Sequence, residues 1–481
     1  MATGAAPDET RARVRPPRIA FLSYSSAEYD ARTARMARTA LRAGYEVVVY
    51  ARDDPGLPDV ERRDGYVVRR VPWAASSLVP GLGTLIRLLK PGPEPVPPPV
   101  AAPTRVHAAA AAAAPPRLQP TSRRRRIAQR LRSFPPGVVV TLLVMFPLRP
   151  VAWSRSLERV LEPADLYHGM WAGSLPALAR HPARLGGRTV YDSRDVYLES
   201  RGFAHLPRPI RALLARLERR WARRVDRVLT VNEAYAGLLE AGLGVNRPVV
   251  VRNCPERWVP PEPPPDLIRE ALGLPATTAV VLYQGQLISD RGIEQAMEAI
   301  LEVEGAVLVL MGFGGMRVAL EAQIARVPWA GKAFLLPPVP PDVLLRWTAS
   351  ADVSVMPIAA SSLNHRYTTP QKLFESLSAG VPVVASDLPG MAEVVRDADA
   401  GLLCDPQDPR SIAAAIRELL AASPAERQSR RRRILQVVSE RYSWEVQEPV
   451  LLDLWASLLE GGPGGPTPAP GGQGLPVDSG A

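Results

Sequence analysis

The amino-acid sequence predicts an α/β protein that contains two doubly wound parallel sheets. Its first half opens with an apolar run at residues 18–24, a helical pattern at 30–43 and a second apolar run at 46–52, which together indicate a β-α-β unit. The same alternation begins again at residues 280–285, after a break rich in proline. Two successive units of this kind predict two Rossmann-like domains.

The remaining strands are expected in short apolar runs, separated by helical patterns. In the first half these runs are residues 166–170, 189–194, 227–233 and 249–253. In the second half they are residues 307–312, 333–338, 353–358, 381–386 and 401–405. An amphipathic pattern at 441–459 predicts a long final helix.

Changes of composition indicate the domain boundaries. Six prolines at 254–265 predict a linker, which separates a first domain at 18–253 from a second at 266–440, with the final helix at 441–460. Three low-complexity segments are expected to be disordered or loosely packed. They are the amino terminus at 1–17, a proline- and alanine-rich insertion at 91–120 and a tail at 461–481.

The composition restricts the class of protein. The formal net charge of +11 suits phosphorylated ligands, nucleic acid or an anionic membrane, although only three basic residues are lysines, so much of the charge is arginine surface. Two cysteines make neither a disulfide framework nor a zinc site, and a reducing cytoplasm is expected. We expect no signal peptide and no membrane span, because the longest apolar run, at 137–148, is too short.

The predicted helix after Thr369 carries two charged side chains on one flank. Thr369 is expected to cap this helix and Gly380 to end it, and Lys372 and Glu375 are three residues apart. A surface ion pair would explain them, but Lys372 lies in the first turn, where the helix dipole disfavours a cation. A bound phosphate resolves that conflict, and Glu375 can then accept hydrogen bonds from sugar hydroxyls. The pattern predicts a site for a nucleotide that carries a sugar.

Two other turns follow predicted strands, at the edge where α/β sheets bind ligands. Gly312, Gly314 and Gly315 make a glycine-rich turn whose N–H groups can approach a phosphate, although a purely structural turn explains them equally well. Arg291 stands at a predicted helix start, where an arginine opposes the helix dipole unless an anion lies nearby. A solvated arginine is the alternative.

The string TTPQKLFESLSAGVPVVASDLPGMAEVV resembles the donor-site signature of glycosyltransferase family 4 (group 1), the retaining GT-B enzymes. GQLISDRGIE, LMGFGG and AGLLCDPQDP occur around it in the family's order, and the first half matches loosely through DLYHG and DRVLTVNEAYAGLL. The resemblance covers roughly residues 18–90 and 150–460. It implies a GT-B fold, in which two Rossmann-like domains face each other across a cleft and the final helix crosses back to the first domain.

The resemblance also implies metal-independent transfer from a nucleotide-sugar substrate to a glycan, lipid-linked or small-molecule acceptor, with retention at the anomeric carbon and without a cofactor. Arg291 and Lys372 then match the basic residues that neutralise the leaving diphosphate. Glu375 matches the second glutamate of a paired motif, which holds the ribose hydroxyls. His168 resembles the family's histidine near the reacting centre, although a lone histidine at a strand end is more often structural.

The sequence departs from the family pattern where the donor sugar would bind. The first glutamate of the motif would fall at Tyr367, and Asn364 or His365 is expected to substitute for it beside Thr369. Gln286 stands where the family usually has another arginine. For this reason neither the donor sugar nor the base or acceptor is predicted.

A basic stretch at 122–134 precedes the apolar run at 137–148. One hypothesis is peripheral attachment to an anionic membrane, and the alternative is a buried helix preceded by a solvated charge run. Nucleic acid is not an expected partner, because the basic run has no interleaved aromatic residues. Two functions compete with glycosyl transfer: a non-catalytic nucleotide-binding scaffold, favoured by the missing glutamate, and a sugar-nucleotide 2-epimerase, which would need more carboxylates.

Overall fold

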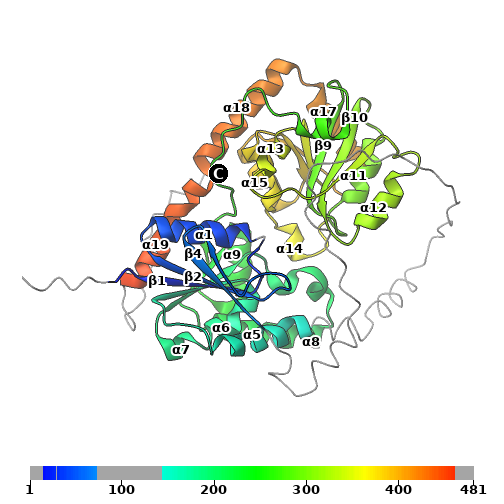
Figure 1. Ribbon diagram of the computed structural model, residues 1–481. Helices are drawn as coiled ribbons and strands as arrows, with labels where there is room; N and C mark the ends of the chain where they lie inside the picture. The colour runs from blue at the N-terminus through cyan, green and yellow to red at the C-terminus, as the bar shows by residue number, and fades with distance from the viewer. Residues whose placement is uncertain (1–14, 29, 73–142, 461–481) are drawn as a thin grey trace, which may run out of the picture.

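The computed structural model describes residues 15–28, 30–72 and 143–460 of the 481-residue chain (Figure 1). The predicted insertion at 91–120, the basic stretch at 122–134, the tail at 461–481 and most of the amino terminus lie outside these residues. Figure 1 shows two α/β lobes, one above the other, with a pair of helices from the carboxyl-terminal part of the chain running along one side of both.

The first lobe is built on an eight-stranded sheet in the order β3-β4-β2-β1-β5-β6-β7-β8. All neighbouring strands are parallel except β3 and β4, which form an antiparallel hairpin. The strands are β1 (Arg18–Ser23), β2 (Glu46–Arg52), β3 (Val60–Arg63), β4 (Tyr66–Val71), β5 (Leu166–Met170), β6 (Arg188–Ser193), β7 (Arg227–Thr230) and β8 (Val249–Val250). The sequence correctly predicted all of these strands except the hairpin.

The hairpin was missed because β3, with the sequence VERR, is short, charged and partly exposed, as edge strands often are. Its turn contains Asp64 and Gly65, both with positive φ, a typical two-residue hairpin connection. Helices and short helical turns connect the other strands. They are α1 (Ala31–Arg42), η2 (Val144–Leu148), α5 (Arg149–Leu157), η3 (Ala172–Ser174), α6 (Leu175–Leu178), α7 (Pro182–Leu185), η4 (Tyr197–Glu199), η5 (Arg201–His205), α8 (Arg208–Ala222), α9 (Glu233–Leu239) and η6 (Glu240–Gly244).

The second lobe is built on a six-stranded parallel sheet in the order β11-β10-β9-β12-β13-β14, the strand order of a Rossmann fold. The strands are β9 (Ala279–Gln286), β10 (Ala306–Phe313), β11 (Ala333–Leu336), β12 (Val353–Met356), β13 (Val383–Ser386) and β14 (Gly401–Cys404). Its helices are α10 (Leu267–Leu272), α11 (Ile293–Ile300), α12 (Arg317–Ile324), α13 (Leu344–Thr348), α14 (Leu363–Arg366), α15 (Gln371–Ser378), α16 (Pro389–Asp397) and α17 (Pro409–Ala421). All six strands occur where the sequence predicted them.

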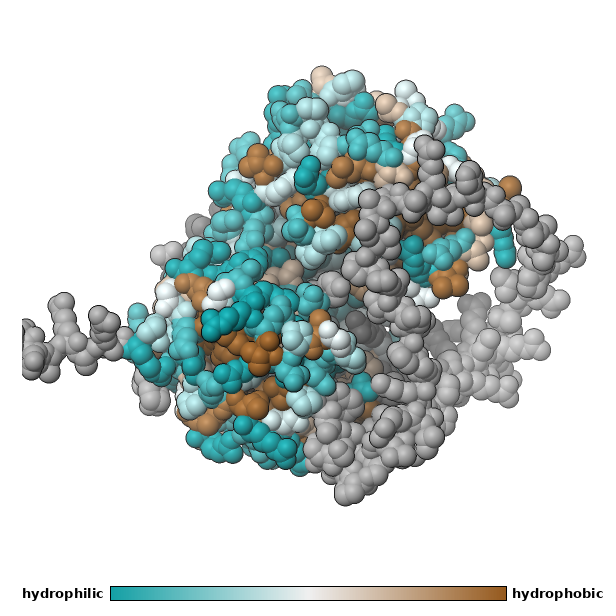
Figure 2. Space-filling view, viewed as in Figure 1, coloured by the Kyte–Doolittle hydropathy of each residue, from teal (hydrophilic) through white to brown (hydrophobic). Residues whose placement is uncertain are grey.

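Residues 251–266 connect the two lobes without helix or strand, and the proline-rich segment at 254–265 lies within this connection. On the face drawn in Figure 2, hydrophobic side chains form small groups separated by hydrophilic ones. Among the described residues no helix is long and apolar enough to cross a membrane.

The described end of the apolar run at 137–148 packs into the first lobe. Phe146 in η2 has no exposed surface, and its ring meets those of Tyr197, Phe203 and Trp221. The burial of Phe146 agrees with the alternative that this segment packs into the first lobe, although Leu148 is 38% exposed.

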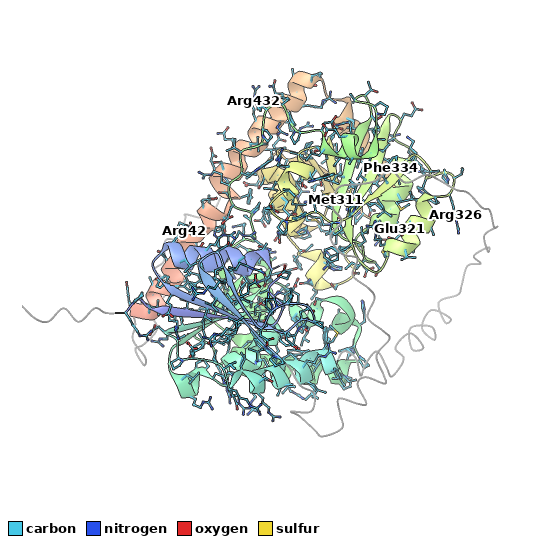
Figure 3. The ribbon with its side chains drawn as sticks, in the orientation of Figure 1. Arg42, Met311, Glu321, Arg326, Phe334 and Arg432 are labelled. Atoms are coloured by element: carbon cyan, nitrogen blue, oxygen red, sulfur yellow. The ribbon has the colours of Figure 1, made fainter. Side chains whose placement is uncertain are left out.

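Two helices end the described chain, α18 (Pro424–Arg441) and α19 (Trp444–Glu460). The sequence predicted only the second, because α18 carries many arginines and only two of its residues are buried. As expected, the final helix crosses back to the first lobe. The Trp444 indole donates to Thr39 Oγ1 over 2.9 Å, and Arg42 of α1, labelled in Figure 3, pairs with Glu448 at 2.6 Å.

The deepest contact of α19 is with His168 in the middle of β5. Trp455 donates its Nε1–H to His168 Nδ1 over 3.1 Å, and Phe21 packs against both rings. Burial lowers the pKa of this imidazole from 6.5 to about 4. The neutral ring therefore accepts from α19, and a proton on Nδ1 would remove that hydrogen bond.

This histidine predicts how stability depends on pH. In the unfolded chain this imidazole is protonated below pH 6.5, whereas in the folded protein it is protonated only below about pH 4. The contribution of His168 to the free energy of unfolding should therefore fall as the pH drops from 6.5 to about 4. In His168→Gln, whose amide oxygen can still accept from Trp455, urea denaturation at pH 7, 5.5 and 4 should show a shallower loss than in the wild type. His205→Gln, at an exposed site, should follow the wild type. Parallel curves for all three proteins would contradict the prediction.

Candidate functional site

The second sheet has a topological switch point between β9 and β12, where the chain runs to opposite sides and α/β proteins bind ligands. The loop after β9 contains Arg291 and Gly292. Gly292 has φ +72°, and a Cβ there would lie 1.9 Å from the Pro357 carbonyl oxygen in the loop after β12. Only glycine permits this approach, which brings the two loops together beside Arg291.

Lys372 reaches this switch point from the first turn of α15. Its ammonium lies 3.7 Å from the ring centre of Tyr283 on β9. It also lies beside Gly285, where a Cβ would be 3.4 Å from Nζ. The Nζ atom is buried, and no hydrogen-bond acceptor lies within reach of it among the described residues. A buried ammonium without an acceptor is costly, so this position is suited to a ligand that supplies one.

Glu375 lies one turn further along α15 and is 8% exposed. Gln284 donates to its Oε2 over 2.8 Å, and Gln371 donates to its Oε1 over 2.7 Å. Gln284 in turn accepts from the Thr348 hydroxyl at 2.7 Å. The carboxylate is thus held in one orientation by two amides, with lone pairs left for further donors.

Sequence reasoning missed Gln284, Gln371 and Thr348 as partners of Glu375. Gln284 is an amide inside an otherwise apolar β9 run, and this is the only sequence signal that pointed to it. The three residues come from different elements, so their meeting depends on the packing of α13 and α15 against β9.

The electrostatics of the pair favour an anionic ligand. Burial, followed by the charge of Arg291, lowers the pKa of Lys372 well below its usual value, and Glu375 only partly opposes this shift. Burial also raises the pKa of Glu375, against the hydrogen bonds from Gln284 and Gln371. Two neighbouring cations, Arg291 and Lys372, therefore repel each other here, and a diphosphate would relieve that repulsion.

The glycine-rich turn has a structural requirement of its own. A Cβ on Gly312 would lie 1.8 Å from the Gly285 carbonyl oxygen, and one on Gly314 would lie 2.3 Å from that of Leu287. Both glycines have positive φ, and Gly315 follows them before α12 begins at Arg317. Close backbone packing between the ends of β9 and β10 accounts for Gly312 and Gly314, so the structural alternative has direct support.

Thr369 does not cap α15, contrary to the prediction. The N-cap is Pro370, without a side-chain hydrogen bond, because the Thr369 hydroxyl instead accepts from Asn232 Nδ2 over 3.1 Å. Gly380, with φ +70°, follows the C-cap Ala379 and ends the helix as predicted.

Asn364 and Tyr367 connect the two lobes. Asn364 is buried: its Oδ1 accepts from the Val196 N–H at 2.9 Å and its Nδ2 donates to Asp195 Oδ1 at 3.0 Å, both in the loop after β6. The Tyr367 ring packs on the core of the first lobe, and its carbonyl accepts from Asn232 Nδ2 at 3.0 Å. The side-chain amide of Asn364 is therefore occupied by the first lobe, and His365 remains as the other substitute, with Nδ1 2.8 Å from Ser361 Oγ.

A polar chain links the first lobe to Glu375. Arg35 of α1 donates to Asn253 Oδ1 over 2.6 Å, and Asn253 donates to Gln371 Oε1 over 3.2 Å. Gln371 is the residue that holds Glu375 Oε1. Burial, followed by the charge of Arg32, lowers the pKa of Arg35 to about 10. The orientation of Glu375 thus depends on residues of both lobes.

The structure corrects the prediction that places His168 near a reacting centre. The residue has no exposed surface, and its ring lies among Phe21 and Trp455 on the side of the sheet that α19 covers. Strand alternation explains this outcome, because a residue in the middle of β5 points into one face of the sheet and not beyond its end. The described residues also contain no group of three His, Cys, Asp or Glu side chains that could hold a metal ion.

The two Rossmann-like sheets, and a final helix that returns to the first of them, define the GT-B class of fold. Residues 278–422, within the second lobe, match the family model described as "Glycosyl transferases group 1". This match includes Arg291, Lys372 and Glu375.

Solved structures agree with the fold over nearly the whole chain. Sucrose-phosphate synthase from Thermosynechococcus elongatus superposes with a TM-score of 0.64 at 17% identity, covering 92% of this chain and 99% of that one. HepE from Anabaena, solved in complex with UDP and glucose, superposes with a TM-score of 0.61 at 15% identity, covering 92% and 100%.

Curated relatives match over a shorter length. A D-inositol 3-phosphate glycosyltransferase from Acidothermus cellulolyticus is 32% identical over 32% of this chain and 36% of its own length. A 2-deoxystreptamine glucosyltransferase from Streptomyces kanamyceticus is 27% identical over 54% of this chain and 68% of its own length. For the first three relatives, the chain spans only 36–46% of their length.

The buried ammonium makes a prediction about proton linkage. A diphosphate would raise the lowered pKa of Lys372, so UDP binding should take up protons at pH values between the lowered and the raised pKa, and should weaken as the pH rises through that interval. Calorimetry in bicine and in Tris, which differ in ionisation enthalpy and contain no phosphate, should detect this uptake in the wild type and not in Lys372→Met. Lys332→Met is a matched control, because Lys332 donates to the Val303 carbonyl away from the site. Equal uptake in all three proteins would show that Lys372 is not the linked group.

Proposed function

We propose that the protein is a glycosyltransferase that moves a sugar from a nucleotide-sugar donor to an acceptor bound at the first lobe. The observation that carries the proposal is the buried Lys372 ammonium, which lies beside Arg291 at the switch point of a Rossmann-like sheet and finds no hydrogen-bond acceptor in the described part of the chain. A diphosphate is an anion of suitable charge for two such cations. Helix α15 then presents Glu375, one turn later, to ribose hydroxyls.

In this proposal the transfer is metal-independent and retains the configuration of the anomeric carbon. The bond between that carbon and the diphosphate oxygen breaks, a bond to the acceptor oxygen forms, and the proton of the acceptor hydroxyl passes to the leaving diphosphate. Arg291 and Lys372 stabilise the negative charge that develops on the leaving diphosphate, in a buried setting where such charge interactions are strong. Gln284 and Gln371 fix Glu375 so that the nucleoside is held while the bond breaks.

UDP-glucose is the first donor to test, because HepE binds UDP and glucose with a similar fold. The acceptors in the names of the curated relatives, D-inositol 3-phosphate and 2-deoxystreptamine, are both polar six-membered rings. We propose a cytoplasmic enzyme with an acceptor of that general kind, which includes a sugar on a glycan or lipid carrier.

Thermal shift with UDP-, GDP-, ADP- and dTDP-sugars, followed by nucleotide release, tests the donor site. A ligand at a hundred times its dissociation constant adds about 2.7 kcal/mol to the free energy of unfolding. Lys372→Ala and Glu375→Ala should each lower affinity at least about tenfold, and nucleotide release should fall with it. Glu321→Ala is the control, because Glu321 is an exposed residue of α12 (Figure 3).

The outcomes separate the candidate functions. Nucleotide binding without release of nucleotide from the donor and without sugar transfer would favour the scaffold. Tyr367, which stands in place of the motif's first glutamate, also favours that alternative. Conversion of the donor sugar to its 2-epimer would favour the epimerase. Absence of any nucleotide binding would overturn all three.

We also propose that the basic stretch at 122–134 attaches the protein to anionic membranes. Each basic residue near such a surface contributes about 1 kcal/mol. Flotation with phosphatidylglycerol liposomes should recover the wild-type protein at low salt and lose it as salt rises. Replacing Arg123, Arg124, Arg125 and Arg126 with Gln should abolish flotation, and neutral phosphatidylcholine liposomes are the control. Flotation that salt does not change would contradict the proposal.

A further inference from the structure

Two large aromatic side chains are exposed, and both lie at the ligand-binding edges of the sheets. Among the described tryptophan and phenylalanine residues, only Trp171 and Phe313 are exposed, at 36% and 47%. Trp171 follows directly after β5 in the first sheet, and Phe313 is the last residue of β10 in the second. Trp153, Trp444 and Trp455, in contrast, are fully buried. The exposure of Trp171 therefore needs a reason other than core packing.

The backbone at Trp171 is held in a conformation that side chains avoid. Its φ is +72° and its ψ 158°, although it is not a glycine. Three hydrogen bonds maintain this conformation: its N–H donates to the Asp192 carbonyl at 3.1 Å, and its carbonyl accepts from the Ser174 N–H at 2.9 Å and hydroxyl at 2.7 Å. Strained positions of this kind persist where the surroundings fix them, and they cluster at functional sites.

The support beneath Trp171 is rigid. Asp192, whose carbonyl accepts from Trp171, is fully buried, and its carboxylate receives Arg32 Nε at 2.7 Å. Gly173 packs so closely on Tyr24 that a Cβ would lie 2.4 Å from the ring. The backbone of Trp171 is thus held by β6 on one side and by η3 on the other, while its indole remains accessible.

Trp171 occupies the switch point of the first sheet. In the sheet β1 lies between β2 and β5. The strands that follow β1 continue on one side of it as far as β3, and the strands from β5 onward continue on the other side, so the strand order reverses between β1 and β5. The next strand, β6, leads at the same edge to Asp195 and Val196, which bond to Asn364 of the second lobe. Trp171 therefore stands at the edge that faces the donor domain, which is where an acceptor has to bind.

We propose that the Trp171 indole is a platform for the acceptor, against which the C–H face of a polyhydroxylated six-membered ring packs. This inference rests on the proposed function and deepens it by naming the substrate class and the residue that holds it. An aromatic face takes the apolar side of such a ring and leaves its hydroxyls free for polar partners. The fixed peptide means that the platform needs no rearrangement when the ring arrives.

Saturation-transfer NMR with methyl α-D-glucopyranoside and myo-inositol as probes tests the platform without requiring turnover. The proteins are the wild type, Trp171→Ala, Trp171→Phe and, as a control, Val318→Ala at an exposed site of α12. UDP is present throughout, and its thermal shift is recorded for each protein.

The wild-type protein should transfer saturation to at least one probe. The Trp171→Ala substitution should weaken the affinity for that probe at least about tenfold. Trp171→Phe should keep it within about threefold, because a smaller aromatic face remains. The UDP thermal shift and the Val318→Ala protein should be unchanged. With UDP-glucose and the probe that binds the wild type, Trp171→Ala should lose the UDP release that depends on that probe.

Equal probe signals in the wild type and Trp171→Ala, or no signal from either probe in the wild type, would overturn the platform. A protein that binds none of the UDP-, GDP-, ADP- and dTDP-sugars would overturn the proposed function instead, and the probe signals would still decide the role of Trp171. A Trp171→Ala protein that has lost its UDP thermal shift would show a structural role for the residue and would likewise overturn the platform.

Discussion

The site depends on one electrostatic constraint, a buried lysine ammonium that no acceptor from residues 15–28, 30–72 or 143–460 reaches. Helix α15 cannot release Lys372 to solvent, because Leu373, Phe374 and Leu377 on the same helix are fully buried in the core. The side chain is therefore held beside Arg291 whether or not an anion is present, and a bound anion favours its protonated form. Binding an anion here gains the interaction without the reorganisation that a flexible side chain would need.

The second feature is that the donor site is shared between the lobes. Glu375 is oriented through Gln371 by Asn253 and Arg35, and the segment before α15 is held by the first lobe through Asn364. A change in the relative position of the lobes would alter these contacts. The position of the Glu375 carboxylate and the arrangement of the domains are thus physically coupled.

Tyr367 shows how the departure from the family pattern is accommodated. Its ring packs on the first lobe, and its carbonyl oxygen lies so close to α16 that a Cβ on Gly390 would be 2.4 Å from it. A glutamate at 367 would place a charge against that apolar surface. Of the two substitutes that the sequence offered for the missing glutamate, His365, with Nδ1 2.8 Å from Ser361 Oγ, is the one whose side chain makes no hydrogen bond to the described part of the first lobe.

The sequence by itself determined the two sheets, the final helix and the segment that carries Lys372 and Glu375, because apolar periodicity, proline breaks and glycine stops are local signals. Only the tertiary structure decided what those residues meet. Strand alternation places His168 in the core. The Thr369 hydroxyl accepts a hydrogen bond from Asn232 and does not cap its helix, and Gln284 donates a hydrogen bond to Glu375. Each of these outcomes depends on partners more than 90 residues apart, since burial and hydrogen bonding are settled by packing that no local pattern encodes.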